Sequence, residues 1–533
     1  MPIPIIDLFA GPGGLGEGFS SRLTDENTER VFDIKLSIEK DENAYKTLQL
    51  RSFFRKFPVG EAPTEYYDVL RAQSEKEREL LIQELFDKYP EQAEEASEEA
   101  WCAELGSENF PPELVDQRIE DALGGERNWV LIGGPPCQAY SMAGRSRVGG
   151  IDKEDNRVYL YQEYLRIIAK HHPAVFVMEN VKGLLSAEVN GEKVFDWIKK
   201  DLQDPNSIFG GLNSPTYKIF SLSHDPNDID EDGNPIYNKD RDFLIKAENY
   251  GIPQKRHRII LLGIRADLEN PEQILTPSAN QIKLEEIIND LPKVRSGVGR
   301  RIIGVKKDGK KTRRIYRKEE NTDRNWNLIV NNFRSEIIDW DGFAKEYSAK
   351  KIKTPVYGTG AEFIDFETPI TTNPLKEWYS DPQGFKGACN HITRTHLIED
   401  LKRYMFSSMF ASIHDRFPRL REFEEHGEEL LPDHKSAASG NFADRFRVQI
   451  KDSPATTVTS HISKDGHYFI HYDPEQCRSL TVREAARIQT FPDNYLFRGS
   501  RTAQYHQVGN AVPPYLAYQI AEIVEEIIYA NNR

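Results

Sequence analysis

The hexapeptide Gly-Gly-Pro-Pro-Cys-Gln at residues 133–138 places a thiol on a constrained turn, directly after the apolar run at residues 129–132. The glycines allow backbone or ligand to approach closely, and the prolines fix φ and remove two amide donors. A thiol held in this way can act as a nucleophile, because the thiolate is the reactive form of cysteine. The hexapeptide therefore predicts a nucleophile at Cys137, with a purely structural turn as the alternative.

A glycine-rich segment at residues 7–16 follows the first expected strand and opens a helix. Gly11, Gly13 and Gly16 match the GxGxxG pattern, and Glu39 ends the second expected strand, where dinucleotide sites carry an acid that binds ribose. Glycines at this point let a ligand lie against the backbone beside a helix N-terminus. The pattern predicts a nucleoside site and leaves NAD, FAD and S-adenosylmethionine open as its ligand.

Two further polar segments stand at expected strand ends. Glu179, in the segment Met-Glu-Asn-Val at residues 178–181, would share the sheet edge with the thiol; a helix-capping pair of Glu and Asn is the alternative. Arg256 and Arg258 alternate within residues 254–258, so in an extended chain both face one side. Two guanidinium groups on one face can stabilise a polarised carbonyl or clamp a phosphate, whereas a basic strand end paired with surface acids is the alternative.

These segments need a sheet to bring them together, and the first 265 residues supply the pattern of one. Short apolar runs alternate with helix-length stretches such as residues 157–170, which is typical of a doubly wound, Rossmann-like α/β domain with a parallel sheet covered on both faces. Strands are expected at residues 4–9, 34–38, 130–132, 174–178, 217–222 and 259–264. The stretch at residues 61–126 interrupts the alternation, and we expect helices at residues 75–89 and 91–103 there.

Charge is segregated along the chain, whose formal net charge is −15. Residues 61–126 carry 20 acids against 5 bases, a net of −15, whereas residues 293–318 carry 12 bases against one acid, a net of +11. The acidic stretch suits a solvated helical insertion, with a docking surface or a screen that repels DNA on one side as the alternative. No apolar run reaches the roughly 18–20 residues of a membrane span, and the four cysteines form no CxxC pair. We therefore expect a cytoplasmic protein without a bound metal.

Taken in order, these segments and two later ones resemble the DNA (cytosine-5)-methyltransferase family. The family motifs and their positions here are DxFxGxGG at 7–14, PPCQ at 135–138, ENV at 179–181, QxRxR at 254–258, RxLTxREAARxQxFP at 478–492 and GNxVPP at 509–514. Six motifs in order, over almost the whole chain, make a chance resemblance negligible. The resemblance is to the type found in bacterial restriction-modification systems, or to solitary enzymes of the same kind.

The resemblance implies methylation of C5 of a cytosine in a specific double-stranded DNA sequence, with S-adenosyl-L-methionine converted to S-adenosyl-L-homocysteine. Cys137 would add to C6 of a cytosine flipped out of the duplex, Glu179 would contact N3 and N4, and Arg258, with Arg256 beside it, would hold the O2 side. For the cofactor, the resemblance implies Phe9, Ala10, Gly11, Pro12, Gly14, Glu39, Lys40, Pro136, Leu160, Asn510 and Ala511.

DNA contacts are expected from two regions. The loop after the turn would contribute Gln138, Ser141, Arg145 and Arg147, and the basic cluster would contribute Arg300, Arg301, Lys310, Lys311, Arg313 and Arg314. A solvated basic hairpin is the alternative for the cluster. Two positions depart from the family pattern: Pro12 replaces a larger apolar residue, and the acid that follows the third strand and contacts adenine is obscured within the acidic stretch.

The predicted organisation is a catalytic domain at residues 1–265 with an acidic helical insertion at about 55–127, a smaller irregular target-recognition domain at 266–499, and a segment at 500–533 that returns to the first domain. We expect a monomer that acts on duplex DNA, with a restriction endonuclease for the same site as a further partner. The alternatives are an RNA cytosine methyltransferase, a catalytically silent DNA-binding regulator, and a dinucleotide oxidoreductase, which only the glycine loop supports.

Overall fold

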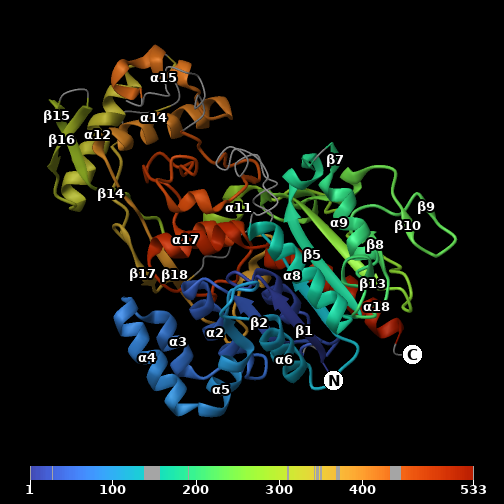
Figure 1. Cartoon of the computed structure of the whole chain (residues 1–533). Coiled ribbons are helices and arrows are strands. Elements are labelled where there is room, and N and C mark those ends of the chain that lie inside the picture. Colours follow the sequence, from blue (N-terminus) through green and yellow to red (C-terminus); the bar gives the residue numbers. More distant parts are fainter. Residues whose placement is uncertain are drawn as a thin grey trace.

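The structure, a computed structural model, describes residues 2–26, 28–136, 156–189, 191–308, 311–340, 342–343, 347, 351–367, 373–431 and 446–531. One sheet forms the centre of the larger part of the molecule, at the right of Figure 1, and the helices and the hairpin of residues 300–338 and 398–426 lie at the upper left. Within the described part of the chain, no helix is both long and apolar enough to cross a membrane.

The central sheet has the doubly wound arrangement that the sequence predicts. Its strands are β1 (Ile3–Leu8), β2 (Phe32–Glu39), β3 (Ala100–Cys102), β4 (Val130–Gly133), β5 (Val175–Val181), β8 (Tyr217–Ser221), β11 (Leu244–Lys246) and β13 (His257–Arg265). The order is β3-β2-β1-β4-β5-β13, and β8 and β11 both pair with the outer edge of β13. All six strands expected from the apolar runs are present.

The expectation of an entirely parallel sheet is wrong at β13. Strands β1 to β5 pair in parallel, but β13 runs antiparallel to β5, β8 and β11. A strand buried on both faces is a continuous apolar run whichever way it points, so hydrophobicity could not reveal its direction. The reversal matters for the site, because it brings the first residues of β13 to the edge where β5 ends.

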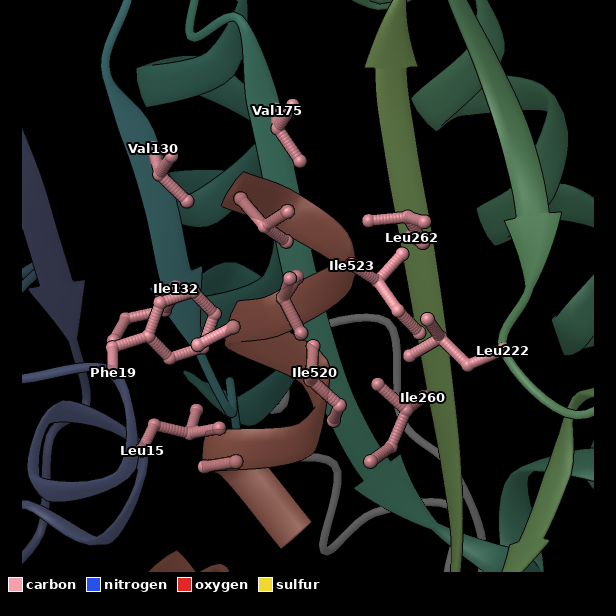
Figure 2. Packing of buried hydrophobic residues seen from close by; sticks show 14 of the residues in the cluster. Leu15, Phe19, Val130, Ile132, Val175, Leu222, Ile260, Leu262, Ile520 and Ile523 are labelled. Carbon is pink, nitrogen blue, oxygen red and sulfur yellow. The ribbon is translucent and has the colours of Figure 1, made fainter. Parts of the chain in front are cut away.

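Alternate side chains of the strands point to opposite faces of the sheet and pack into two apolar layers, one on each face. On one face α1 (Gly14–Ser20) and α18 (Pro514–Ala530) cover the sheet. Figure 2 shows Phe19 of α1 next to Ile132, and Ile520 and Ile523 of α18 on the side of Ile260 and Leu262. On the other face lie α6 (Pro112–Leu123), α8 (Asn156–His171) and α9 (Val194–Gln203). The last helix of the chain thus lies beside the first.

The acidic stretch differs from the expected run of helices. After α2 (Glu42–Arg55), it forms α3 (Thr64–Arg71), α4 (Glu75–Lys88) and α5 (Pro90–Glu99), but the helix expected at residues 91–103 ends at Glu99. The next residues, Ala100–Cys102, are the edge strand β3, whose Ala100 pairs with Ser37 of β2. Four apolar residues, 100–103, were too short a signal to separate from the helix before them. The stretch therefore supplies one strand of the sheet.

Residues 266–511 contribute to two further apolar clusters around buried aromatic side chains. One contains Trp326 of α12 (Asp323–Ile338) and Tyr404 and Phe406 of α14 (Ile398–His414). The other joins α11 (Leu284–Ile288), α16 (Val482–Ile488) and α17 (Arg501–Asn510). The hairpin of β15 (Arg300–Asp308) and β16 (Lys311–Lys318) lies at the edge of the view in Figure 1.

Short elements complete the chain: β6 (Glu188–Val189), β7 (Glu192–Lys193), α10 (Asn206–Phe209), β9 (Asp228–Ile229), β10 (Pro235–Ile236), β12 (Gln254–Lys255), β14 (Gly297–Val298), β17 (Gly360–Ile364), α13 (Lys376–Tyr379), β18 (Ala388–Ile392), β19 (Thr395–His396), α15 (Leu420–His426) and β20 (Ala455–Thr456). The acidic helices contact residues 266–499 directly. The Tyr67 hydroxyl donates to Asp381, and Arg498 forms an ion pair with Glu75. The domain boundaries predicted from the sequence stay predictions.

Buried histidines in these clusters give a prediction about pH. Burial lowers the pKa of His391 to about 4, and it also lowers the pKa of His396 and His471, so folding favours their neutral forms. An unfolded chain protonates histidine near pH 6.5, so it binds more protons than the folded chain between about pH 6.5 and 4. The free energy of unfolding should therefore fall as the pH is lowered through that window.

The variant His391→Gln should flatten this dependence by up to about 1.4 kcal/mol per pH unit. The measurement is urea unfolding at several pH values, and exposed His224, changed to Gln, is the control. An unchanged pH slope in His391→Gln would contradict the assignment.

Candidate active site

A cavity of about 470 Å³ opens at the carboxyl ends of β1, β4 and β5. Ligand sites in doubly wound folds lie at this edge of the sheet. Its described walls come from the glycine-rich loop, the ends of β2 and β5, the segment after β3, the start of β13 and the C-terminal motif. Segments that lie hundreds of residues apart in the sequence therefore meet at one site.

The glycine-rich loop is fixed by Glu39 at the end of β2. The Gly11 amide donates to Glu39 Oε2 at 2.8 Å, and the Asp41 amide donates to Oε1 at 2.8 Å. Burial raises the pKa of Glu39. Phe9, at the start of the loop, has φ +56°, a left-handed conformation that is uncommon for a residue with a side chain and is often found at functional sites.

Asp7 is a polar residue of this cavity that the sequence reasoning did not single out. It lies in β1 and is 1% exposed, and its carboxyl group accepts from the Gly16 amide in the first turn of α1. Burial raises its pKa well above the ordinary value. A buried carboxyl group is costly unless hydrogen-bond donors surround it, and a ligand in the cavity can supply a further donor. Its position within the motif at residues 7–14 was the signal that could have identified it.

The turn that precedes Cys137 packs tightly against its neighbours. A Cβ atom on Gly133 would lie 2.6 Å from the Leu8 carbonyl oxygen, and one on Gly134 would lie 3.1 Å from Glu179 Oε2. Asn180 Nδ2 donates to the Pro135 carbonyl oxygen at 3.4 Å. The two glycines therefore allow close contact, and the segment 179–181 supports the turn. Cys137 itself lies outside the described residues.

Glu179 and Arg258 form an ion pair across two neighbouring strands. In the antiparallel register of β5 and β13, Glu179 lies opposite Ile260, and Arg258 lies opposite Val181. Positions two residues apart on neighbouring strands face the same side of the sheet. Arg258 Nε accordingly lies 2.8 Å from Glu179 Oε1, and both side chains line the cavity. A carboxylate and a guanidinium group are thus held side by side.

Arg256 lines the same cavity from the residue between β12 and β13, but its contacts are with the backbone. Its Nη1 donates to the Val458 carbonyl oxygen at 2.9 Å and lies 3.5 Å from that of Gly509. Burial, together with the neighbouring positive charge of Arg258, lowers its pKa to about 9. These bonds show Arg256 holding the segments around residues 458 and 509, and a catalytic role for it stays a prediction.

The C-terminal motif returns to the site at the end of α17. Asn510 and Ala511 line the cavity, and the Tyr495 hydroxyl donates to the Pro12 carbonyl oxygen of the glycine-rich loop. Thr459, Ser460 and His506 line the cavity as well, and the sequence reasoning missed them. Their signal was weak, because Thr459 and Ser460 stand at the start of a single 3-10 turn, Ser460–Ser463, and His506 is one helical turn before Asn510.

Glu104 is the described acid that follows the third strand and lines the cavity. It lies two residues after β3, and its Oε1 is 3.0 Å from Lys40 Nζ. The sequence could not distinguish it among the many carboxylates of the acidic stretch. Once Ala100–Cys102 is identified as a strand, its position is the one that the family pattern requires.

The structure brings together every expected cofactor residue: Phe9, Ala10, Gly11, Pro12, Gly14, Glu39, Lys40, Pro136, Leu160, Asn510 and Ala511 all line this cavity. The loop residues Gln138, Ser141, Arg145 and Arg147 lie outside the described residues, as does Lys310, and of Lys311 only the backbone in β16 is described. Arg300, Arg301, Arg313 and Arg314 lie on the hairpin β15–β16 and not at the cavity. The binding roles of all these residues stay predictions.

The cavity suits a ligand that joins a flat ring, a diol and an ammonium group. Carboxylates of Asp7, Glu39 and Glu104 offer acceptors, and the apolar side chains of Phe9 and Leu160 offer flat walls. The residues present therefore fit S-adenosylmethionine. With the sheet order and the site at its carboxyl edge, the molecule has the Rossmann-like fold of methyltransferases.

Comparison with known proteins gives the family. The family model of C-5 cytosine-specific DNA methylases matches residues 99–206 and 237–526. The type II methyltransferase M.Bpa9945I of Bacillus paralicheniformis is 32% identical, over 99% of this chain and 100% of that protein. The chain therefore belongs to the C-5 cytosine-specific DNA methylases and is a DNA (cytosine-5-)-methyltransferase.

One more distant relative agrees with this assignment, and one solved structure agrees with the fold. The DNA (cytosine-5-)-methyltransferase M.ApeKI of Aeropyrum pernix is 26% identical, over 76% of this chain and 83% of that protein. A crystal structure of a candidate DNA modification methyltransferase encoded within an Escherichia coli prophage aligns with a TM-score of 0.50 over 99% of both chains, at 17% identity. At that identity the second likeness concerns the fold alone.

The narrow space between Gly134 and Glu179 gives a prediction about activity. In Gly134→Ala the new Cβ would lie 3.1 Å from Glu179 Oε2, so the carboxylate must shift relative to Arg258. We expect methylation to fall by roughly tenfold or more, since small displacements in a site cost about that much, with binding of S-adenosylhomocysteine nearly unchanged. The control is Gly211→Ala, where a Cβ has no neighbour within 4 Å. Equal loss of activity in both variants would contradict the explanation.

Proposed function

We propose that this enzyme methylates C5 of a cytosine within a specific double-stranded DNA sequence, that it flips the base out of the duplex, and that Cys137 forms a transient bond to C6. The observation that carries the proposal is the Glu179–Arg258 pair, 2.8 Å apart and beside the turn that leads to Cys137. The pair offers an acceptor and a donor side by side, as the N4 and O2 edges of a cytosine require.

When bound, S-adenosyl-L-methionine supplies an electrophilic methyl group. Glu39 would accept from the ribose hydroxyls, and Phe9 and Leu160 would contact the adenine. Asp7, whose carboxyl group is buried at the wall of the cavity, would accept from the ammonium group. Glu104 would meet the exocyclic amine of adenine. The described acceptors at the cavity thus match the donors of this molecule.

The chemistry begins with the thiolate of Cys137, which adds to C6 and forms an S–C6 bond. The electron pair of the C5–C6 double bond moves toward N3, where Glu179 shares a proton, while Arg258 stabilises the charge at O2. C5 then gains the methyl group, a base removes the proton from C5, and the electron pair of that C–H bond restores the double bond. The S–C6 bond breaks and returns the thiolate.

DNA would approach with its phosphates toward basic groups. The hairpin β15–β16 contributes Arg300, Arg301, Arg313 and Arg314, and the loop after Cys137 contributes further bases, so binding should weaken steeply with salt. A base stacked in a duplex cannot reach the cavity, so the target must leave the stack. We further propose that the enzyme is monomeric and shares its recognition site with a restriction endonuclease.

The first test is expression in a host free of 5-methylcytosine, followed by mapping of 5-methylcytosine across its DNA. We expect methylation at one defined sequence. Methylation of tRNA but not of plasmid DNA would replace the proposal with an RNA substrate.

The nucleophile assignment predicts that Cys137→Ser abolishes methylation while binding of DNA and S-adenosylhomocysteine is retained. In addition, duplexes with 5-fluorocytosine at the target should leave the wild-type enzyme in a denaturant-stable complex, because fluorine cannot leave C5 as a proton does. Denaturing electrophoresis measures the complex, and Cys102→Ser, on the partly exposed edge strand, is the control. An active Cys137→Ser enzyme would overturn the assignment.

The cofactor assignment predicts that Glu39→Gln weakens binding of S-adenosylhomocysteine. The amide retains the shape of the carboxylate but replaces one of the two oxygens that accept from the Gly11 and Asp41 amides, and the ribose hydroxyls lose the same acceptor. The dissociation constant should therefore rise by roughly tenfold. Titration calorimetry measures it without any methyl transfer. Glu42→Gln, three residues further along and exposed, is the control, and an unchanged constant in Glu39→Gln would contradict the assignment.

A further inference from the structure

A second recess lies directly beside the active-site cavity, and Thr459 lines both. Its volume is about 530 Å³, within the range of roughly 300–1,000 Å³ that small-ligand sites occupy. It forms where β12 pairs in parallel with β20, so that Lys255 lies opposite Thr456. Its described lining consists of Lys255, Arg447, Thr456, Thr457, Thr459, His461, Tyr468 and Phe469.

The chemistry of this lining selects an anion with an aromatic part. Lys255, Arg447 and His461 are basic, and no acid stands among the described lining residues, although the whole chain has a net charge of −15. Threonine hydroxyls and basic side chains are the groups that usually contact phosphate oxygens. The rings of Tyr468 and Phe469 provide flat surfaces on which a base can stack.

Hydrogen bonds and ring contacts hold the lining in place. The Arg447 guanidinium lies 5.0 Å from the centre of the Tyr468 ring, and the His461 ring meets the same ring edge-on at 5.2 Å. The Thr457 hydroxyl donates to the Lys255 carbonyl oxygen at 2.6 Å. Because these groups are already ordered, binding would cost little further side-chain entropy.

The recess is also joined to the catalytic groups. Thr457 and Thr459 line it, whereas Val458 between them is buried and accepts the hydrogen bond from Arg256. Arg256 in turn lies two residues before Arg258, which pairs with Glu179. A group bound in the recess would therefore lie next to a base bound at the Glu179–Arg258 pair.

We propose that this recess binds the nucleotide next to the target cytosine on the same DNA strand. Its phosphate contacts Lys255 and Arg447, and its base stacks on Tyr468. The recess thereby fixes the strand on one side of the flipped base and senses the identity of the neighbouring base. This inference rests on the proposed function, because it takes the target cytosine to lie at the Glu179–Arg258 pair.

The phosphate contact is tested by the salt dependence of DNA binding. For a duplex with the methylated sequence, each phosphate contact contributes about 0.9 to the slope of log K against log salt. Arg447→Ala and Lys255→Ala should each lower that slope by up to about 0.9, whereas Arg447→Lys should retain it. Arg421→Ala, in exposed α15, is the control. Wild-type slopes in both alanine variants would overturn the phosphate contact.

The stacking contact is tested by photocross-linking. Duplexes with 5-iodouracil on either side of the target cytosine should cross-link to Tyr468 at one of the two positions, as mapped by mass spectrometry. Tyr468→Leu should abolish this cross-link and weaken DNA binding by roughly tenfold, whereas Tyr468→Phe should retain both. Cross-links only to residues outside the recess would overturn the proposal.

Two comparisons distinguish the inference about the recess from a site for free nucleotides and from a failure of the proposed function. A free nucleotide, deoxyadenosine monophosphate, should not inhibit methylation at millimolar concentration; inhibition that Arg447→Ala relieves would make the recess a site for free nucleotides instead. If the wild-type enzyme methylates no DNA, the proposed function fails. If it methylates DNA and the variants bind and cross-link as the wild type does, only the inference about the recess fails.

Discussion

The close contact between the beginning and the end of the chain is the constraint on which the site depends. Gly14, at the start of α1, lies so near Val512 that a Cβ atom there would overlap the Val512 carbonyl oxygen. Because this contact is made by backbone, α18 can lie along α1 and bury Ile520 on the sheet. Overfilling such a contact costs about 1–3 kcal/mol and shifts the backbone. The displacement would move the glycine-rich loop and residues 509–511 together.

A buried ion pair between α1 and α2 also positions the helix that follows the glycine-rich loop. Glu17 of α1 accepts from Arg51 of α2, and Arg51 also donates to Asn494 at 3.1 Å. Burial alone would raise the pKa of Glu17, but Arg51 and Arg55 hold it below the ordinary value. Removing one partner of such a pair costs about 3–5 kcal/mol, although the intact pair adds little net stability. The pair therefore fixes the direction of α1 relative to residues 494–495, which in turn contact the loop.

The sequence predicted the strands from local apolar runs, and the resemblance to the family, carried by six short motifs, implied the cofactor residues that line the cavity. It could not predict the direction of β13 or the strand Ala100–Cys102 within acidic helices, since neither leaves a local signal. Thr459 was missed for a related reason. It lines the cavity together with segments hundreds of residues away, and only the folded chain shows that it lies there.

Arg256 shows how one side chain can serve two neighbouring sites. It is 2% exposed, and it has no carboxylate partner among the described residues other than the more distant Glu179. Its guanidinium group instead donates to the carbonyl oxygen of Val458, which lies between two residues that line the recess, and lies near that of Gly509 in the C-terminal motif. A buried guanidinium held mainly by carbonyl oxygens is costly, and the cost falls when an anion approaches. A DNA phosphate close to these segments would therefore stabilise Arg256 and the catalytic edge of the sheet at the same time.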